Sequence, residues 1–218
     1  MKLLVISSSP RREASNTFLL AKEVLKGAAG PAMGCEIIHL YGLKIEFCAQ
    51  CEKCHKTVMG CPIKDDANAV MEKMLKADGI IIASPNYINQ VTASMKALFD
   101  RSAHFIHCKR LLGKYIAGAV SSGSGRDKEV LDYVRYYANV CGAQYSGGVS
   151  SRAMTVNEKM REAFELGKTL ASDIRTKKVY SNQKKTIENA KQYFGEIIKA
   201  RKNDWAGEYQ YWRKKGWL

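Results

Sequence analysis

The sequence predicts an α/β protein built around a doubly wound parallel sheet. Short apolar runs alternate with segments whose apolar residues recur at helical spacing, which is the pattern of βαβ units. One run, residues 79–84, is apolar on both faces, as expected of a central strand that helices cover on either side. The composition is globular, because 46% of the 218 residues are hydrophobic and 26% are charged.

The first half of the chain begins with a strand, a loop and a helix. Residues 3–6 form an apolar run that ends in a hydroxyl-rich loop, and from Ser15 onward apolar residues recur at helical spacing. The dipeptide Gly30-Pro31 is expected to end this helix. Residues 35–40 predict a second strand, which a cysteine-rich loop at residues 48–61 follows.

The same alternation continues to residue 174. Asp65 or Asp66 can cap a helix that precedes the strand at residues 79–84. The later elements are expected to be a helix at about 91–108, a strand at 115–120, a helix at 128–140, a strand at 143–149 and a helix at about 157–174. Five strands joined by right-handed crossovers predict the flavodoxin-like strand order 2-1-3-4-5, with helices on both faces.

Residues 175–218 are expected to form a helical C-terminal extension to the domain of residues 1–174. The formal charge is +14, from 35 basic and 21 acidic residues, and the extension alone carries twelve basic and four acidic residues. All three tryptophans also lie in it. Apolar residues from Ile187 to Ile198 predict an amphipathic helix that docks on its own core domain or on a partner subunit. Nucleic-acid binding by basic and aromatic residues is the disfavoured alternative.

The sequence argues against several classes of protein. No apolar run reaches the length of a membrane span, and polar Ser7, Ser8 and Ser9 follow the N-terminal apolar residues where a signal peptide needs a cleavage region. We therefore expect a cytoplasmic protein without a membrane partner. The sequence has no G-x-x-x-x-G-K-[ST] loop for a nucleotide triphosphate, and Gly123-Ser124-Gly125 matches G-x-G-x-x-G only in part.

Ligands of such a sheet bind beyond the carboxyl ends of the strands, where the loops at residues 7–17, 84–90 and 121–127 should converge. The cysteine loop is expected to arrive beside them. The first loop places hydroxyls and an arginine at a helix N-terminus, which suits a terminal phosphate. Its candidate phosphate-binding residues are Ser7, Ser9, Arg11, Ser15, Asn16 and Thr17.

The other two loops can hold a flat heterocycle. Isoalloxazine needs a stacking wall and hydrogen-bonding groups at its edge, which an aromatic residue and loop amides can supply. The candidate residues are Ser84, Pro85, Asn86, Tyr87, Ile88, Ser122, Gly123 and Ser124. A planar ring next to a phosphate site predicts FMN as the ligand.

Four of the seven cysteines lie within fourteen residues, at Cys48, Cys51, Cys54 and Cys61. The spacing C-x2-C-x2-C-x6-C, with Pro62 after the last cysteine, is similar to the run that wraps one cubane in bacterial ferredoxins. Structural zinc sites usually present two separated pairs, disulfides are disfavoured in a reducing compartment, and reactive thiols explain two cysteines better than four. We favour a [4Fe–4S] cluster over zinc, and zinc over bare thiols. His55 keeps the zinc alternative open.

The remaining cysteines and two histidines have simpler expected roles. Cys35, Cys108 and Cys141 lie in or beside apolar segments and are expected in the core. His104 and His107 lie one turn apart near a helix end, where they are expected to complement the helix dipole.

These residues resemble the iron-sulfur flavoproteins, a branch of the NAD(P)H-dependent FMN reductase group with a flavodoxin-like fold. The resemblance covers roughly residues 1–175 and rests on Ser9-Pro10-Arg11 with Ser15-Asn16-Thr17, on the four clustered cysteines, and on Ser84-Pro85-Asn86-Tyr87. The compact cysteine motif is its specific part. Ser8 stands where the family commonly has glycine. The resemblance implies a homodimer or homotetramer and electron exchange with ferredoxin.

The expected function is that of an oxidoreductase that passes electrons between FMN and a [4Fe–4S] cluster, with ferredoxin or NAD(P)H as donor. No acid or base residue is needed, since the cofactors carry the chemistry. One alternative is an NAD(P)H-dependent FMN, quinone or azo reductase without a cluster. The other is a zinc-knuckle module that binds RNA through the basic, aromatic extension; it leaves the first loop unexplained.

Overall fold

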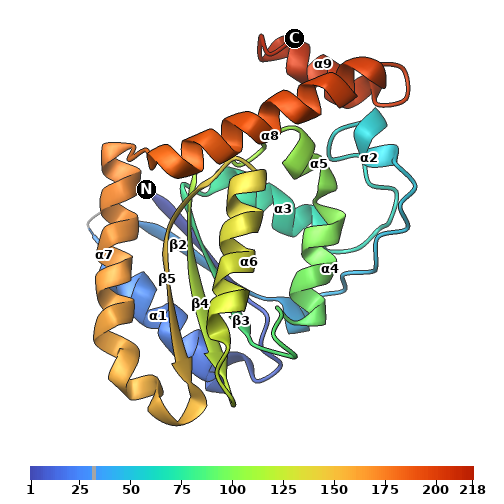
Figure 1. The fold of residues 1–218 in the computed structure, drawn as a ribbon. Coiled ribbons are helices and arrows are strands. Elements are labelled where there is room, and N and C mark those ends of the chain that lie inside the picture. The colour runs from blue at the N-terminus through green and yellow to red at the C-terminus, as the bar shows by residue number, and fades with distance from the viewer. Residues whose placement is uncertain (31–32) are drawn as a thin grey trace.

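The computed structural model describes residues 1–30 and 33–218 and is built on one five-stranded parallel sheet (Figure 1). Across the sheet the strands are β2 (Gly34–His39), β1 (Lys2–Ser7), β3 (Gly79–Pro85), β4 (Tyr115–Ser122) and β5 (Gln144–Arg152). The predicted order 2-1-3-4-5 is confirmed. All seven residues of β3 are buried, as expected of a central strand.

Helices cover both faces of the sheet and divide the core into two clusters. One face packs against α1 (Asn16–Ala28) and α7 (Met160–Thr176), and the other packs against α3 (Ala67–Lys76), α4 (Ala93–Arg101) and α6 (Asp127–Val140). Each helix therefore buries one apolar stripe against the β-branched residues of the strands.

Several boundaries differ from the sequence predictions. The helix expected at residues 91–108 is divided into α4 and α5 (Ala103–His107), because the Ser102 hydroxyl donates to the Phe99 carbonyl at 2.8 Å and competes with the helix ladder. Gly30 follows α1 as expected, and Pro31 lies outside the described residues. Four short elements were not predicted: η1 (Arg12–Ala14), η2 (Leu40–Gly42), α2 (Lys53–Lys56) and η3 (Ala153–Lys159).

Two glycines bring α1 and α7 into backbone contact. A Cβ on Gly27 would lie 1.9 Å from the Phe164 carbonyl oxygen, and a Cβ on Gly167 would lie 2.0 Å from the Val24 carbonyl oxygen. These distances are far below van der Waals contact, and neither obstructing atom belongs to a flexible side chain. The helix pair that covers this face therefore depends on residues without a side chain.

We expect Gly27→Ala to lower the free energy of unfolding by roughly 2 kcal/mol, because overpacking outweighs the gain of about 1 kcal/mol in helix propensity. Urea unfolding followed by far-UV circular dichroism measures this change. Gly34→Ala is the matched control, since a Cβ there meets no atom of residues 1–30 or 33–218 within 4 Å. Equal unfolding midpoints for the two variants would contradict the expectation.

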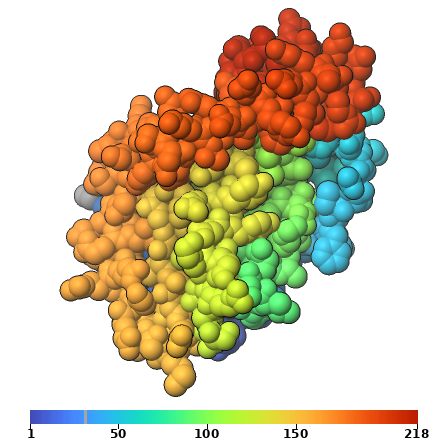
Figure 2. Space-filling view, viewed as in Figure 1, coloured from blue at the N-terminus to red at the C-terminus, as the bar shows by residue number. Residues whose placement is uncertain are grey.

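The C-terminal extension packs on the core domain of its own chain. Its long helix α8 (Ser181–Ala200) crosses the amino-terminal end of the sheet, and α9 (Ala206–Lys214) lies beside α2 (Figures 1 and 2). The Tyr115 hydroxyl donates to the Lys178 carbonyl at 2.9 Å, and Trp205 and Trp212 are buried. These two indole rings are therefore part of a small core and are not available as stacking platforms for bases, which disfavours the RNA-binding alternative.

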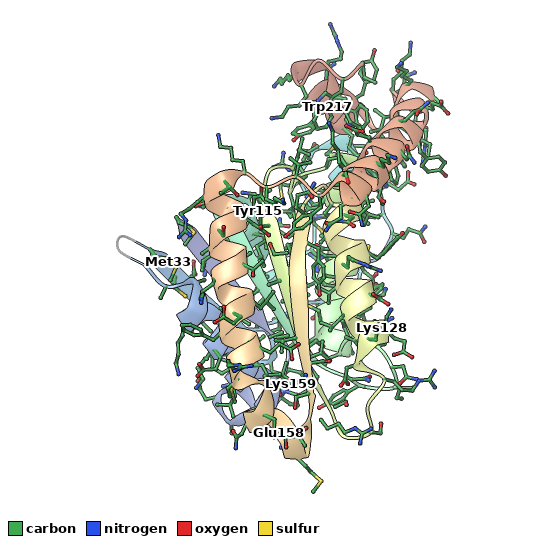
Figure 3. The ribbon with its side chains drawn as sticks, turned by 60° about the vertical axis from the view of Figure 1, so that its left-hand side comes forward. Met33, Tyr115, Lys128, Glu158, Lys159 and Trp217 are labelled. Atoms are coloured by element: carbon green, nitrogen blue, oxygen red, sulfur yellow. The ribbon has the colours of Figure 1, made fainter. Side chains whose placement is uncertain are left out.

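The two ends of the sheet are well separated. Figure 3 shows Tyr115 and Trp217 toward the end that the extension covers, and Lys128 and Glu158 toward the opposite end. Among the helices of residues 1–30 and 33–218, none has both the length and the apolar character of a membrane span.

Candidate functional site

Three loops meet at the carboxyl ends of β1, β3 and β4, as predicted. In the sheet Ser7 lies beside Ala83 and Pro85 lies beside Ser121, so the loops leave neighbouring strands at the same edge. The Thr17 and Ser121 hydroxyls form a hydrogen bond, which joins the first loop to the third. The Asn86 amide donates to the Ser121 carbonyl at 2.8 Å, which joins the second loop to the third. The loops therefore form one continuous rim.

The first loop retains the features of an anion site. Ser7, Ser9 and Ser15 are buried, whereas the Arg11 side chain is exposed at the rim. The Ser7 hydroxyl is buried and has no hydrogen-bond partner among the described residues. Ser15 is the N-cap residue of α1, and its side chain makes no capping hydrogen bond. A bound phosphate would satisfy these groups and the free amides of the first turn.

Two residues predicted for this site are bonded to later segments of the chain. The Asn16 side-chain amide donates to the Ala153 carbonyl at 3.0 Å, and Thr17 is bonded to Ser121. Both side chains therefore fix the first loop against later segments of the chain. This leaves Ser7, Ser9, Ser15 and Arg11 as the side chains available to an anion.

The second loop turns sharply at its tip. Tyr87 and Gln90 exchange backbone hydrogen bonds, and the two residues between them have positive φ values, 53° at Ile88 and 58° at Asn89. Positive φ at both central positions is the geometry of a type I′ turn, which is strained for a β-branched residue. Ile88 is fully exposed and Tyr87 is half exposed, so this strained tip presents apolar surface at the rim.

Ser84 and Asn86 hold the loops in shape. The buried Ser84 hydroxyl donates to the Pro85 carbonyl and accepts from the Thr92 amide at 3.0 Å. The Asn86 side-chain amide donates to the Gly125 carbonyl at 3.0 Å. These residues position backbone groups at the rim. The Oδ1 atom of Asn86 is buried and has no hydrogen-bond partner among the described residues.

The third loop contains the small residues expected beside a flat ring. The Ser122 hydroxyl accepts from the Gly125 amide at 2.9 Å, which closes a short turn around Gly123 and Ser124. A Cβ on Gly123 would meet no atom within 4 Å. The space at Gly123 is therefore open.

All four clustered cysteines line one cavity of about 270 Å³. The loop that carries them turns through left-handed conformations at Gln50 and Glu52, with φ values of 48° and 56°. The other walls come from the end of α4, from α5 and from the C-terminal extension; they include Arg101, His107 and Trp205. Residues that are far apart in the sequence thus enclose a space lined by sulfur.

Hydrogen-bond donors reach two of the sulfurs. The Gln50 amide donates to Cys48 Sγ at 3.4 Å, and Arg101 Nη2 donates to Cys61 Sγ at 3.3 Å. Burial, followed by the nearby Glu208, Cys61 and Cys48, raises the pKa of the Cys54 thiol to about 12. A thiol with such a pKa is a poor nucleophile, which disfavours bare redox thiols. A metal bound here would supply the positive charge that favours thiolates.

The cysteine cavity does not lie beside the three loops, contrary to expectation. Helix α4 starts just after the second loop and ends at Arg101 in the cavity wall, so the two sites lie at opposite ends of a helix about 13 Å long. The chain after β2 is held away from the rim because the Lys44 amide donates to Asp66 and the Glu46 amide to Asp65, each at 2.8 Å.

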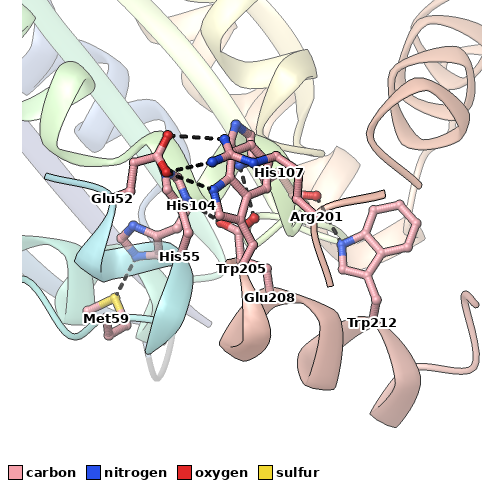
Figure 4. A network of polar contacts seen from close by, with 9 residues as sticks. All are labelled: Glu52, His55, Met59, His104, His107, Arg201, Trp205, Glu208 and Trp212. Carbon is pink, nitrogen blue, oxygen red and sulfur yellow. Dashed lines mark hydrogen bonds and ion pairs between the residues drawn. The ribbon is translucent and has the colours of Figure 1, made fainter. Parts of the chain in front are cut away.

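A network of buried polar and aromatic groups joins the cysteine loop to the extension (Figure 4). Glu208 is completely buried and lies 2.7 Å from His55 Nδ1 and 3.0 Å from His107 Nδ1. The Trp205 ring packs against both imidazoles, with centroid distances of 4.6 and 4.8 Å. Beside it, Arg201 forms a bidentate ion pair with Glu52.

These two histidines and the glutamate hold one another and are a poor metal site. The His55 and His107 rings are stacked at an interplanar angle of 17°. The lone pair of an imidazole nitrogen lies in the plane of its ring, so two stacked rings cannot both point at one ion. His55 thus connects the loop to the extension through Nδ1. It also lines the cavity of the four cysteines, so its alternative role as a zinc ligand at that cavity stays a prediction.

Two further expectations need correction. Cys108 and Cys141 are buried as predicted, but Cys35 is exposed because β2 is an edge strand whose outer face is uncovered. Burial lowers the pKa of His104 to about 4, with a smaller effect from Arg110, so His104 is neutral near pH 7. A neutral ring carries no charge with which to complement the helix dipole.

Sequence reasoning missed Arg101, Asp65, Trp205 and Glu208 as residues around the cysteine cavity. Arg101 follows the apolar residues Leu98 and Phe99 on the inner face of α4, and a charge on a buried face is a signal that could have found it. The sequence alone contains no comparable signal for Glu208, which lies 153 residues from its partner His55.

Comparison with known proteins identifies the family. Residues 1–163 match the family described as NADPH-dependent FMN reductase. The chain belongs to this family. The predicted membership is confirmed, and with it the classification among FMN-dependent oxidoreductases.

Named relatives of this FMN reductase family member are iron-sulfur flavoproteins. One from Methanocaldococcus jannaschii is 40% identical over 127 residues, which cover 58% of this chain and 64% of that relative. One from Archaeoglobus fulgidus is 28% identical over an alignment of 230 positions, gaps included, that spans both chains completely. The solved structure of a flavone reductase has a TM-score of 0.65 at 20% identity and covers 80% of this chain and 63% of its own; this likeness shows a shared fold.

Proposed function

We propose that this chain is a redox flavoprotein that holds FMN at the three loops and a [4Fe–4S] cluster at Cys48, Cys51, Cys54 and Cys61. The observation that carries the proposal is that all four cysteines of one compact run line a single cavity. Donors to Cys48 and Cys61 also support it, because hydrogen bonds to the ligating sulfurs are a general feature of iron–sulfur sites. The names of the relatives agree with it.

The FMN half of the proposal rests on the first loop and the family. The unpartnered Ser7 hydroxyl and the uncapped start of α1 fit a terminal phosphate. Tyr87 and the open space at Gly123 fit a flat ring between the second and third loops. The match to FMN reductases covers all three loops.

When bound, FMN exchanges one or two electrons and an iron–sulfur cluster exchanges one. The residues of the chain bind these groups, orient them and exclude water. The Ser7 and Ser15 hydroxyls hold the phosphate, and the thiolates hold the cluster. Trp205 closes the cavity from the side of the extension and limits the access of water.

We also propose an electron donor and an oligomeric state for this protein. NAD(P)H is supported by the family description, and an acidic carrier such as ferredoxin is supported by the formal charge of +14, which would steer its approach. We place the protein in the cytoplasm as a homodimer or homotetramer. A rate of reduction by ferredoxin that does not change with ionic strength would contradict the electrostatic argument.

The test is anaerobic purification followed by a visible spectrum and by iron, sulfide and flavin analysis. We expect flavin bands on a broad iron–sulfur absorbance, with one FMN and about four irons and four sulfides per chain. Stoichiometric zinc with no iron would contradict the cluster. A colourless protein that neither iron and sulfide nor FMN can reconstitute would contradict the whole proposal.

The second candidate is an NAD(P)H-dependent FMN, quinone or azo reductase without a cluster. The family description favours it directly, since it names the flavin and the nicotinamide alone. Rapid bleaching of the flavin by NADPH in a variant that lacks the cavity cysteines, at the rate of the wild-type protein, would favour this candidate over the first.

A further inference from the structure

Arg101 places a buried cation in the wall of the cysteine cavity. Its side chain is 2% exposed, at the last residue of α4. The Nη2 atom donates to Cys61 Sγ at 3.3 Å and to Asp65 Oδ1 at 3.1 Å, and Nη1 donates to the Glu46 carbonyl at 3.0 Å and to Asp65 Oδ2. Among the residues that line the cavity, Arg101 is the one that carries a permanent positive charge.

The partners of Arg101 keep its charge in place. Asp65 also accepts from the Glu46 amide at 2.8 Å and from the Ala67 amide at 3.1 Å, so the carboxylate is fixed by both the cysteine loop and the start of α3. An arginine side chain stays protonated in proteins, so the charge of Arg101 does not depend on its neighbours.

One donor of this guanidinium has no partner. The Nε atom of Arg101 is buried, and no described residue accepts its hydrogen. The contact between Arg101 and the sulfurs of the cavity therefore runs through Nη2 and Cys61. The sulfides and thiolates of an iron–sulfur cluster are acceptors, and the cluster with its four thiolates carries net negative charge.

We propose that Arg101 is a positioning residue that orients Cys61 and raises the reduction potential of the cluster. The inference rests on the proposed function. Reduction adds one electron, and hence one negative charge, to the site. A fixed cation in contact with a ligating sulfur stabilises that added charge, and net charge and sulfur hydrogen bonds are the means by which proteins set such potentials. Asp65 lowers the reduction potential, because its negative charge offsets the positive charge of the guanidinium with which it pairs.

The test is a redox titration of the anaerobically reconstituted protein with dithionite as the electron donor, followed by electron paramagnetic resonance of the reduced cluster. In Arg101→Gln we expect the ratio of reduced to oxidised cluster at a fixed potential to fall at least tenfold, which is 59 mV for one electron. In Asp65→Asn we expect the ratio to rise. Arg135→Gln removes the same charge from a half-exposed site on α6 and is expected to leave the ratio unchanged.

The reduction potential is expected to fall in Arg101→Gln and to rise in Asp65→Asn, so either variant can overturn the inference. If Arg101→Gln does not retain iron, Asp65→Asn alone decides, and an unchanged or lower potential in that variant overturns the inference. An unchanged potential in Arg101→Gln with full iron content also overturns it. Both results leave the proposed cluster standing, whereas a wild-type protein that binds no iron contradicts the proposed function and this inference together.

Discussion

Cys61→Ser is expected to remove iron and sulfide from the protein while leaving its FMN in place. Cys61 is the last cysteine of the run, and a serine oxygen is a poor substitute for a thiolate toward iron. Iron content should fall from about four per chain to well below one after anaerobic reconstitution. The flavin should remain because α4 separates the cavity from the three loops. Metal analysis and the flavin absorbance of the same sample measure both outcomes.

Cys35→Ser provides the matched control. Cys35 is exposed on the edge strand β2 and does not line the cavity, so this variant should keep both its iron and its flavin. Full iron content in Cys61→Ser would show that Cys61 is not a ligand. Loss of FMN together with iron would contradict the separation of the two sites.

Glu208→Gln is expected to detach the C-terminal extension from the cysteine loop. The carboxylate is completely buried and serves both His55 and His107, and hydrogen bonds to a charged group contribute about 1.5–3 kcal/mol each. The amide of glutamine can accept at its single oxygen, so one imidazole loses its acceptor. We expect the free energy that holds the extension to fall by about 3 kcal/mol.

Urea unfolding separates this effect from a general loss of stability. All three tryptophans lie in the extension, so their emission follows its undocking, while far-UV circular dichroism follows the whole fold. In Glu208→Gln the emission change should precede the circular dichroism change. Glu196→Gln, an exposed position on α8, should behave as the wild-type protein. Coincident transitions at the wild-type midpoint in Glu208→Gln would contradict the expectation.

The same carboxylate should make the docked extension sensitive to acid. Burial alone would raise the pKa of Glu208, but the hydrogen bonds from His107 and His55 outweigh it and lower the pKa below its ordinary value. A lowered pKa stabilises the docked state above the unfolded value of about 4.3, and this stabilisation is lost as the pH falls through the folded-state pKa. Tryptophan emission of the wild-type protein should report undocking in that range, and Glu208→Gln should lack this step.

Most of the sheet could be predicted because local patterns determine it. The apolar run of β3 and the alternation of strands with helices are properties of neighbouring residues, and the right-handed crossover rule then leaves few arrangements. The break at Ser102 could not be predicted in this way. It depends on a hydroxyl that bonds both its own helix and the Tyr137 hydroxyl at 2.8 Å, which is a tertiary contact.

The candidate sites also combine features that local sequence patterns predict with features that depend on tertiary contacts. The compact spacing of the cysteines and the hydroxyls before α1 are local signals. The four cysteines do line one cavity, and the phosphate-binding role of the hydroxyls stays a prediction. The position of the cysteine cavity is not local. It follows from the ion pair between Asp65 and Arg101. Both side chains are hydrogen-bonded to the backbone of Glu46, and these contacts hold residues 44–46 along α4 and away from the rim. Two oppositely charged residues 36 positions apart carry no pairing signal in a single sequence.

The contact between His55 and Glu208 joins positions 153 residues apart, and this has a consequence for biosynthesis. A ribosome that adds 5–20 residues per second needs on the order of ten seconds or more to make the intervening chain. In the later part of that interval all four thiols have been synthesised, while Trp205 in the cavity wall has not. Nascent chains therefore pass through a stage in which the four thiols lack the wall that the C-terminal extension contributes.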